Sequence, residues 1–228
     1  MAKTSANGSA RAPRRKDGLS REVIIQSAIE LLDGGGEGAL TLRALTIRLN
    51  TGYGAIYHHV ADKGDLLATA TDEIFARVLT GAVIDTDPRE NLRHLALGLF
   101  DAIDAHPWVA AELSRQPWRP VLLDFYESIA GLLDALDVPE RARFDAAGTF
   151  MSYVLGDAVQ NAATARHLAA SGMDRAAFLG AAATQWAEVN PGKYPFVHAA
   201  VSQLRDHDDR EQFLAGVDIF LAGIAALR

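Results

Sequence analysis

The sequence contains no cysteine among its 228 residues. This absence excludes a disulfide framework, a thiolate metal site and a cysteine nucleophile, and it fits a protein of the reducing cytoplasm. Long apolar runs are also missing: none reaches the roughly 18 residues that a membrane helix needs. The first 16 residues have no apolar segment of the signal-peptide kind. We therefore expect a cytoplasmic protein that has no membrane-spanning part.

The motifs of common catalytic sites are absent as well. The sequence has no Gly-x-Ser-x-Gly elbow, no Walker A loop and no dinucleotide fingerprint. His58 and His59 are adjacent, so on a helix they point about 100° apart and do not chelate one ion together. The other histidines have no i, i+4 partner and no neighbouring glutamate in a zinc-binding pattern. We expect no metal, no cofactor and no enzymatic activity, although a helical enzyme with a scattered site stays an alternative.

Strand signals are scarce, because no alternating apolar and polar run is bounded by turn residues. Apolar residues instead recur at helical spacing between breaks at proline and glycine. A first helix is predicted from Ser20 to the glycine run 34–36, followed by short helices over 41–49 and 52–60. Longer helices are predicted over 62–81, 88–105, 107–115, 119–136, 140–169, 174–189, 195–205 and 210–227. The predicted fold class is therefore all-α.

Positive charge is scarce overall but concentrated at the start of the chain. The net charge is −7, yet residues 1–60 hold eight Lys and Arg against five Asp and Glu, and the remainder holds 14 against 24. Since phosphate binding depends on local charge, this basic head on an acidic body is compatible with DNA binding. The alternative is a solvated basic tail. Residues 1–17 have no apolar periodicity and are predicted to form a disordered basic arm.

Residues 41–59 have the pattern of two short helices joined by a turn. Thr41 is a suitable N-cap for the first helix, and Asn50 tolerates the left-handed conformation of a tight turn. Four residues are expected to form the helix crossing: Leu45, Leu49, Ile56 and Val60. The outer face of the second helix would carry Tyr53, Gly54, Ala55, Tyr57 and His58. Small residues let such a helix enter a major groove, and Tyr and His offer hydrogen bonds to DNA, but any helical hairpin gives a similar two-helix pattern.

The segment from Leu40 to Leu67 resembles the tetracycline-repressor (TetR) family of regulators. It contains a Thr-Leu-Arg opening, then Gly-Ala-Ile-Tyr-His-His-Val, then Asp-Lys-Gly-Asp-Leu-Leu, and residues 19–32 resemble the first helix of the family. The C-terminal part resembles the branch of the tetracycline repressor itself, through His106-Pro107-Trp108, residues 151–160 and residues 213–223. The resemblance implies an N-terminal helix-turn-helix domain and a larger helical ligand-binding and dimerisation domain.

The resemblance also implies roles for individual residues. Phosphate contacts would fall to Thr41, Arg43 and Lys63, and Tyr57 and His59 would contact the DNA backbone or fix the helix. Bases would be read by Gly52, Tyr53, Gly54, Ala55 and His58, while Arg14, Arg15 and Lys16 of the arm would reach a groove. The chain departs from the usual family pattern at Asn50, Thr51, Gly52 and Gly64, so an operator sequence does not transfer to it.

Two apolar helix faces have two interpretations. The helix over 140–169 carries Gly148, Ser152 and Gly156 at four-residue spacing, which allows close approach by another helix. The helix over 210–227 carries an apolar stripe formed by Phe213, Val217, Phe220 and Ile224. Such faces are too apolar for water. They pack either within the monomer or in a four-helix homodimer interface, and the resemblance favours the interface.

A ligand pocket is a further expectation. The candidate ligand-binding residues are Trp108, Trp118, Phe125, Met151, Asp157, Gln160, Asn161, Phe178 and Trp186. The aromatic and methionine side chains would line a cavity, and the polar groups near Asp157 would need partners that a ligand supplies. Aromatic residues at helical spacing are, however, often plain core, and polar groups on such a helix are often exposed or bonded across a dimer.

The hypothesis from the sequence is a repressor that binds double-stranded operator DNA as a homodimer and releases it when a small-molecule inducer binds. The expected organisation is a basic arm over 1–17, a helix-turn-helix domain over 18–65 and a ligand-binding and dimerisation domain over 66–228. An activator of the same architecture is the nearest alternative. A different alternative is a helical ligand carrier or enzyme in which the N-terminal hairpin is only scaffold.

Overall fold

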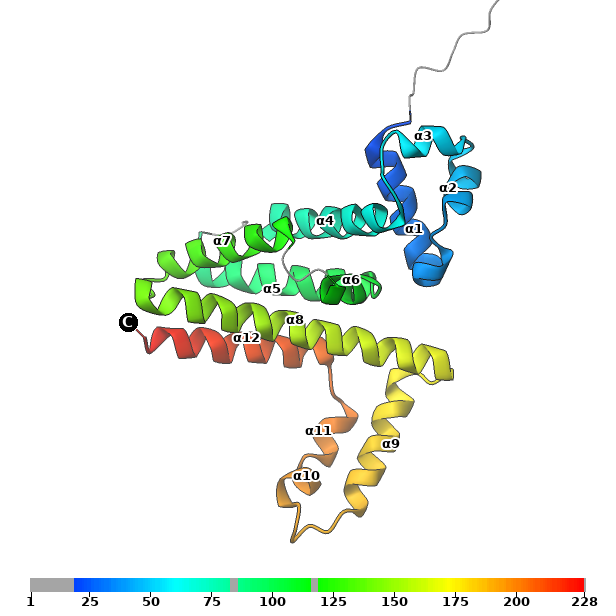
Figure 1. Cartoon of the computed structure of the whole chain (residues 1–228). Coiled ribbons are helices and arrows are strands. Elements are labelled where there is room, and N and C mark those ends of the chain that lie inside the picture. The colour runs from blue at the N-terminus through cyan, green and yellow to red at the C-terminus, as the bar shows by residue number, and fades with distance from the viewer. Residues whose placement is uncertain (1–18, 83–85, 116–118, 228) are drawn as a thin grey trace, which may run out of the picture.

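The computed structural model describes residues 19–82, 86–115 and 119–227 (Figure 1). Within these ranges every regular element is a helix, which confirms the predicted all-α class. None of these helices combines the length and the apolar character that crossing a bilayer requires. The predicted arm over 1–17, including Arg14, Arg15 and Lys16, lies outside the described residues, as does Trp118.

The helices follow the predicted order closely. They are α1 (Arg21–Ala39), α2 (Leu42–Leu49), α3 (Tyr53–Tyr57), α4 (Lys63–Ala82), α5 (Pro88–Ala105), α6 (Val109–Arg115), α7 (Pro120–Ala135), α8 (Glu140–Ser171), α9 (Arg175–Glu188), α10 (Pro195–Ala199), α11 (Val201–Arg205) and α12 (Asp209–Ala225). The prediction of one helix over 195–205 was wrong, because the chain forms two short helices that meet at Ala200.

The glycine run interrupts the first helix without fully ending it. The backbone leaves helical geometry at Gly35 and at Gly36, where φ is 63°. That left-handed conformation costs glycine little because it has no β-carbon. The chain then makes a further turn to Ala39, so the predicted break is present and the helical segment extends beyond it.

Helices α1, α2 and α3 gather at one end of the molecule (Figure 1). α1 packs against both α2 and α4, and its inward residues Ile24, Ala28 and Leu32 are almost completely buried. Side-chain bonds reinforce the contact with α4: Arg21 donates to the hydroxyl of Thr69 at 2.9 Å, and Arg77 of α4 donates to Gln26 at 3.0 Å. The N-terminal unit is therefore tied to the long helix that leads into the rest of the fold.

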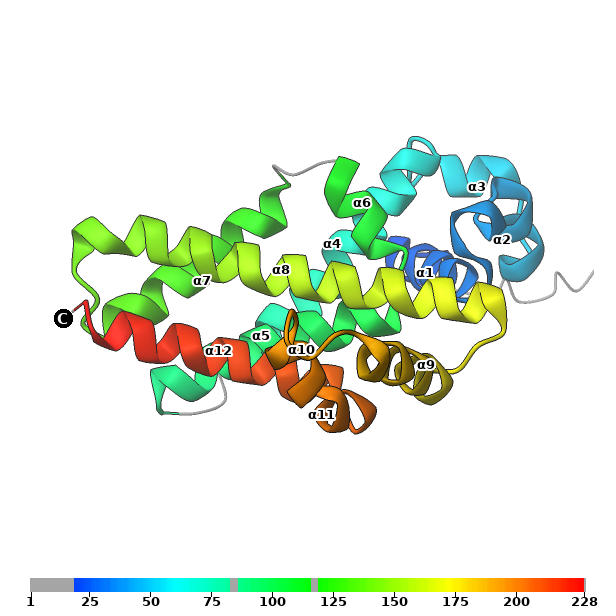
Figure 2. The same cartoon turned by 90° about the horizontal axis from the view of Figure 1, so that it is seen from below.

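The body of the molecule is a bundle of α4, α5, α7, α8 and α12 (Figures 1 and 2). Its core contains aromatic pairs between helices that are distant in sequence. Phe75 of α4 and Phe125 of α7 meet edge to face at 5.3 Å between ring centroids, and Phe100 of α5 packs on Phe213 of α12 at 4.6 Å. Each of these rings buries a large apolar surface, so the two pairs help to hold the bundle together.

Helices α8 and α12 run side by side in both views (Figures 1 and 2). The Tyr153 hydroxyl of α8 donates to the backbone oxygen of Phe213 at 2.8 Å, and the two rings stack at 5.6 Å. Phe213, Val217 and Ile224 are buried within the monomer. Of the two interpretations of this stripe, packing within the monomer therefore accounts for these three residues.

Helices α9, α10 and α11 form an arm that projects from the bundle (Figure 1). α9 packs mainly against α11. The arm leaves the end of α8 through Gly172, where φ is 68°, and returns to the bundle at α12. Residues of α9, α10 and α11 therefore face the second half of α8 and the start of α12 across a shared cavity.

Candidate DNA-binding surface and ligand pocket

The turn between α2 and α3 has the predicted local chemistry. The Thr41 hydroxyl accepts a hydrogen bond from the backbone N–H of Ala44 at 3.0 Å, so it caps α2. Asn50 adopts a left-handed conformation with φ 48° and ψ 53°. Gly52 precedes α3 and provides no side-chain cap. The predictions for Thr41 as a cap and Asn50 as a turn residue are confirmed.

The crossing of the two short helices separates an inner from an outer face. Leu45 and Ile56 are fully buried, and Val60 is 3% exposed. On the outer face, Tyr53 and Tyr57 keep 50% and 52% of their surface exposed. The predicted outward orientation of the aromatic side chains is confirmed, while their contact with DNA remains a prediction.

The other predicted DNA-binding residues lie around this outer face. Those that are exposed are Thr41, Arg43, Gly52, Gly54, Ala55 and His58. His59 is half-buried, and its ring meets that of His58 edge to face at 5.3 Å. This burial fits a residue that fixes the helix as well as one that contacts a phosphate.

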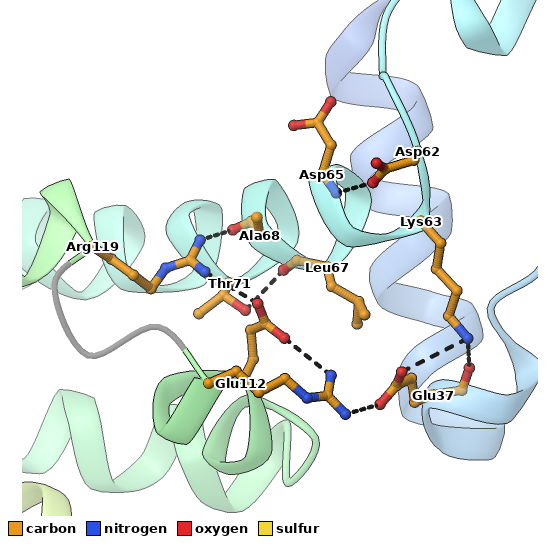
Figure 3. A network of polar contacts seen from close by, with 10 residues as sticks. Glu37, Asp62, Lys63, Asp65, Leu67, Ala68, Thr71, Glu112 and Arg119 are labelled. Atoms are coloured by element: carbon orange, nitrogen blue, oxygen red, sulfur yellow. Dashed lines mark hydrogen bonds and ion pairs between the residues drawn. The ribbon is translucent and has the colours of Figure 1, made fainter.

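Lys63, the first residue of α4, is held by the end of α1 (Figure 3). Its ammonium donates to the backbone oxygen of Glu37 at 2.7 Å and lies 3.9 Å from the Glu37 carboxylate. The same carboxylate accepts from Arg115 of α6 at 2.5 Å, and this hydrogen bond lowers the pKa of Glu37. One glutamate thus joins the predicted phosphate ligand Lys63 to a helix of the larger domain.

A buried ion pair lies next to this contact (Figure 3). The side chains of Arg119 and Glu112 are 2% and 4% exposed, and they meet at 3.3 Å. Arg119 also donates to Asp72 at 3.0 Å and to the backbone oxygen of Ala68. Since buried charges require partners, this network fixes α6 and the start of α7 against α4.

A second polar contact joins α1 to the turn between α5 and α6. The indole N–H of Trp108 donates to the carboxylate of Asp33 at 2.8 Å, and Nδ1 of His106 lies 2.7 Å from the same oxygen. Trp108 is 7% exposed. It lines a cavity of about 360 Å³ between α1, α4, α6 and α8, which Arg166 also borders.

A larger cavity, of about 630 Å³, lies between α8, α9, α11 and the start of α12. The structure brings part of the predicted ligand set together here: Asp157, Gln160, Asn161, Phe178 and Trp186 line this cavity. Phe125 and Met151 lie in the core instead, with 0% and 3% of their surface exposed, and neither lines it. Trp108 borders the smaller cavity described above, so the predicted residues do not form a single site.

Sequence reasoning did not identify several residues of the larger cavity. They include Arg175, Phe196, His207 and Asp209, which come from α9, α10 and the segment leading into α12. Arg175 pairs with Asp209 through two hydrogen bonds, and His207 lies 3.2 Å from the same carboxylate. In the sequence, the cluster of charged residues at 205–211 could have indicated a binding site here, but such a cluster is equally typical of a solvent-exposed helix start.

Asp157 differs from the other charged residues of the larger cavity. Among the described residues, no side-chain hydrogen bond or ion pair is found for its carboxylate, which is half-buried. Burial raises the pKa of Asp157, and the negative charge of Asp209 raises it further, while His207 acts in the opposite direction. The carboxylate is therefore partly desolvated without a compensating partner.

The outer faces of α8 and α12 carry exposed apolar side chains. Phe144 is 86% exposed and Ile219 is 73% exposed. Gly148 and Gly156 have open space where a β-carbon would stand, so a second helix can approach α8 closely at these positions. This outer face is distinct from the inner stripe that packs within the monomer.

The comparisons with known proteins agree with this architecture. The family model described as "Tetracyclin repressor-like, C-terminal domain" matches residues 84–228. This chain is similar to the solved structure of the transcriptional regulator SCO7222, a TetR from Streptomyces coelicolor, with a TM-score of 0.83 and 46% sequence identity. The match covers 92% of this chain and 99% of that chain. An HTH-type transcriptional regulator of Saccharopolyspora erythraea is 33% identical over 63% of this chain, and the match spans only 61% of that relative. The HTH-type transcriptional repressor DrrR1 of Streptomyces coeruleorubidus is 25% identical over 95% of this chain and 82% of its own length.

These matches cover both the N-terminal helix-turn-helix and the larger helical domain. The likeness to a transcriptional regulator over 92% of the chain argues against the alternative of a helical enzyme. The chain belongs to the tetracycline-repressor-like (TetR) family of transcriptional regulators.

Proposed function

We propose that this protein is a transcriptional repressor that binds operator DNA as a homodimer and is released by a small molecule. The observation that carries the proposal is the outer face of α3, where Tyr53 and Tyr57 are about half exposed while Ile56 is buried beneath them. The buried Ile56 fixes the helix to the fold, and the exposed tyrosine hydroxyls can donate hydrogen bonds to DNA, as a recognition helix in a major groove requires. The repressor name of the relative DrrR1 supports repression over activation.

The proposed contacts divide into two groups. Gly52, Tyr53, Gly54, Ala55 and His58 face the bases, with Arg14, Arg15 and Lys16 reaching an adjacent groove. Phosphates are held by Thr41, Arg43 and Lys63, together with Tyr57 and His59. An ammonium has three N–H donors. Lys63 therefore keeps a donor for a phosphate while Glu37 fixes its position.

The proposed dimer forms through the outer faces of α8 and α12. Phe144 and Ile219 are large apolar side chains that are mostly exposed in one protomer, and burying them would remove an unfavourable contact with water. Dimerisation is typical of the family. It doubles the DNA contacts, because each half-site of an operator receives one recognition helix.

The proposed ligand site is the cavity of about 630 Å³, and a continuous set of contacts leads from it to α1. Asn161, which lines the cavity, donates to Asp104 near the end of α5 at 3.2 Å. Two residues later, His106 contacts Asp33 of α1. A ligand that favours a different position of α8 relative to α5 would thus shift the DNA-binding unit, provided that it binds the released state more tightly.

The proposed domain boundaries are those expected from the sequence, with the DNA-binding unit over 18–65 and the ligand-binding and dimerisation unit over 66–228. The match of the family model to residues 84–228 supports a separate C-terminal domain, and its likeness to the branch of the tetracycline repressor itself is part of the proposal. A repressor works where the chromosome lies, so we place the protein in the cytoplasm.

A binding assay with the DNA upstream of the protein's own gene tests the proposal. We expect a labelled fragment to bind, and its affinity to fall steeply between two salt concentrations because bound phosphates release counterions. A fragment of equal length and scrambled sequence is the control. Equal affinity for both fragments, or no binding at low salt, would contradict the proposal.

Two variants separate base reading from phosphate binding. Tyr53→Ala should relax discrimination among operator variants by roughly 1–3 kcal/mol at the affected positions, whereas Lys63→Ala should weaken binding to all sequences and reduce the salt dependence by about one charge. Arg205→Ala, an exposed change on α11, serves as the matched control. If Tyr53→Ala and Lys63→Ala both bind like the parent, the assignment of these residues is wrong.

A further inference from the structure

The walls of the 630 Å³ cavity combine aromatic surface with several ionisable groups. Aromatic rings come from Phe178 and Trp186 of α9 and from Phe196 of α10. The guanidinium of Arg175 already lies over the Phe178 ring at 5.5 Å from its centroid. Aromatic faces attract cations through the negative charge of the π-system, and the contact with Arg175 is one example within this cavity.

The charged groups of the cavity do not balance one another. Asp209 is satisfied by two hydrogen bonds from Arg175 and by His207. Asp157 is left without a hydrogen-bond or ion-pair partner among the described residues. Both carboxylates act against an incoming anion, and the guanidinium of Arg175, which would attract an anion, is already engaged with Asp209.

We propose that the cavity takes an organic cation with an apolar or aromatic body, whose positive centre lies at Asp157 while the body packs against Trp186 and Phe196. This inference rests on the proposed ligand-responsive function and specifies the chemical class of the ligand. A cation supplies the missing partner of a desolvated carboxylate, and its body covers apolar surface that is open in the free protein. Phe196 is 80% exposed, so it gains the most from being covered.

A pair of probes with the same shape and opposite charge tests the inference. Tetraphenylphosphonium and tetraphenylborate are each titrated into the full-length protein by calorimetry. We expect binding of the cation and about tenfold or more weaker binding of the anion, because only the cation gains an attractive charge interaction with Asp157. Equal affinity for the two ions, or a preference for the anion, would overturn the inference.

A charge-neutral variant locates the cation. Asp157→Asn keeps the shape of the side chain and should weaken cation binding about tenfold. Asp124→Asn, an exposed change on α7, should bind the cation like the parent. Unchanged affinity in Asp157→Asn would also overturn the inference, and circular dichroism of both variants verifies that they are folded.

DNA binding is measured separately on the same samples. If the cation binds through Asp157 but does not release the protein from the upstream DNA, the inference about the cavity is supported and the proposed ligand response is contradicted. If the protein binds no specific DNA at all, the repressor proposal fails, and the result with the two ions still decides the chemistry of the cavity.

Discussion

At the scale of single residues, Lys63 is positioned by a hydrogen bond whose acceptor is an uncharged backbone oxygen. Its ammonium donates to the backbone oxygen of Glu37, so the side chain is oriented before DNA arrives. The Glu37 carboxylate adds an ion pair that it shares with Arg115. Because these side chains are nearly half exposed, the ion pairs are screened by solvent and salt. The network therefore orients Lys63 more than it stabilises the fold.

Asp157→Asn should make the protein slightly more stable near neutral pH. Burial raises the pKa of Asp157 above 3.8, so ionisation costs the folded state free energy that the unfolded state does not lose. This cost is absent below pH 3.8 and develops as the pH rises through the folded-state pKa. Since Asp157 is partly exposed, we expect a rise in melting temperature on the order of 1 °C at pH 7.

A series of melting curves from pH 7 down toward pH 4 measures this effect. The advantage of Asp157→Asn should shrink as the pH falls, while Asp124→Asn should follow the parent throughout. A difference that is independent of pH would show that ionisation of Asp157 is not its cause. A loss of stability at pH 7 would show that the carboxylate has an interaction partner in the folded protein.

At the scale of elements, helix boundaries that depend on local chemistry were predictable from the sequence. Ser20 and Thr41 cap their helices through backbone N–H groups three residues later, and Asn50 takes the left-handed turn. The break at Ala200 carries no such signal, because alanine favours helix. Both short helices on either side of it pack against α9, a tertiary contact that the sequence pattern does not show. Tertiary contacts also decide which face of α12 is covered.

Removing Arg119 should cost much of the stability of the junction between α4, α6 and α7. Arg119→Ala leaves the buried carboxylate of Glu112 with Arg115, at 3.2 Å, as its remaining partner. We therefore expect the free energy of unfolding to fall by about 3 kcal/mol, the lower end of the cost of breaking a buried ion pair. Urea denaturation measures the change. Arg205→Ala, on the exposed surface of α11, should stay within about 0.5 kcal/mol of the parent.

A double variant distinguishes loss of the pair from loss of packing. Arg119→Met combined with Glu112→Leu removes both buried charges, so it should recover most of the stability that Arg119→Ala loses. If the double variant is as unstable as the single one, the ion pair is not the reason for the loss.

Gly216 lies where α12 approaches Tyr153 of α8 closely. A β-carbon at this position would overlap with the ring of Tyr153, which is held by its stacking on Phe213 and by its hydrogen bond to the Phe213 backbone. Gly216→Ala should therefore lower the free energy of unfolding by roughly 1–3 kcal/mol.

The matched control is Gly131→Ala on the exposed side of α7, where a β-carbon meets open space. Alanine is the better helix former, so this change should raise stability by about 0.5–1 kcal/mol. The two variants are compared by urea denaturation. Equal stability of Gly216→Ala and the parent would mean that α8 and α12 pack less closely than described.

At the scale of the whole molecule, the candidate sites differ in how much the sequence could predict. The DNA-binding surface lies within one short segment, so the pattern over 41–59 was enough to place Tyr53 outward and Ile56 inward. The ligand cavity joins α8 to a projecting arm and to α12. Asp157 and Trp186 were proposed from their own helices, but Arg175, His207 and Asp209 meet them only through the tertiary fold. Phe125 and Met151 show the converse, because an apolar residue at helical spacing looks the same in a core and beside a cavity.

The central claim is that two copies of α3 are held one turn of DNA apart. The chain has no cysteine, so Ala55→Cys places a single spin label on each exposed α3. Pulsed electron resonance measures the distance between the two labels in the ligand-free dimer without DNA, because a label at this base-facing position would block the DNA complex. We predict one narrow distribution centred at about 34 Å, the spacing of successive major grooves on one face of the duplex. The absence of a dipolar signal, or a distribution centred far from that spacing, would contradict the account.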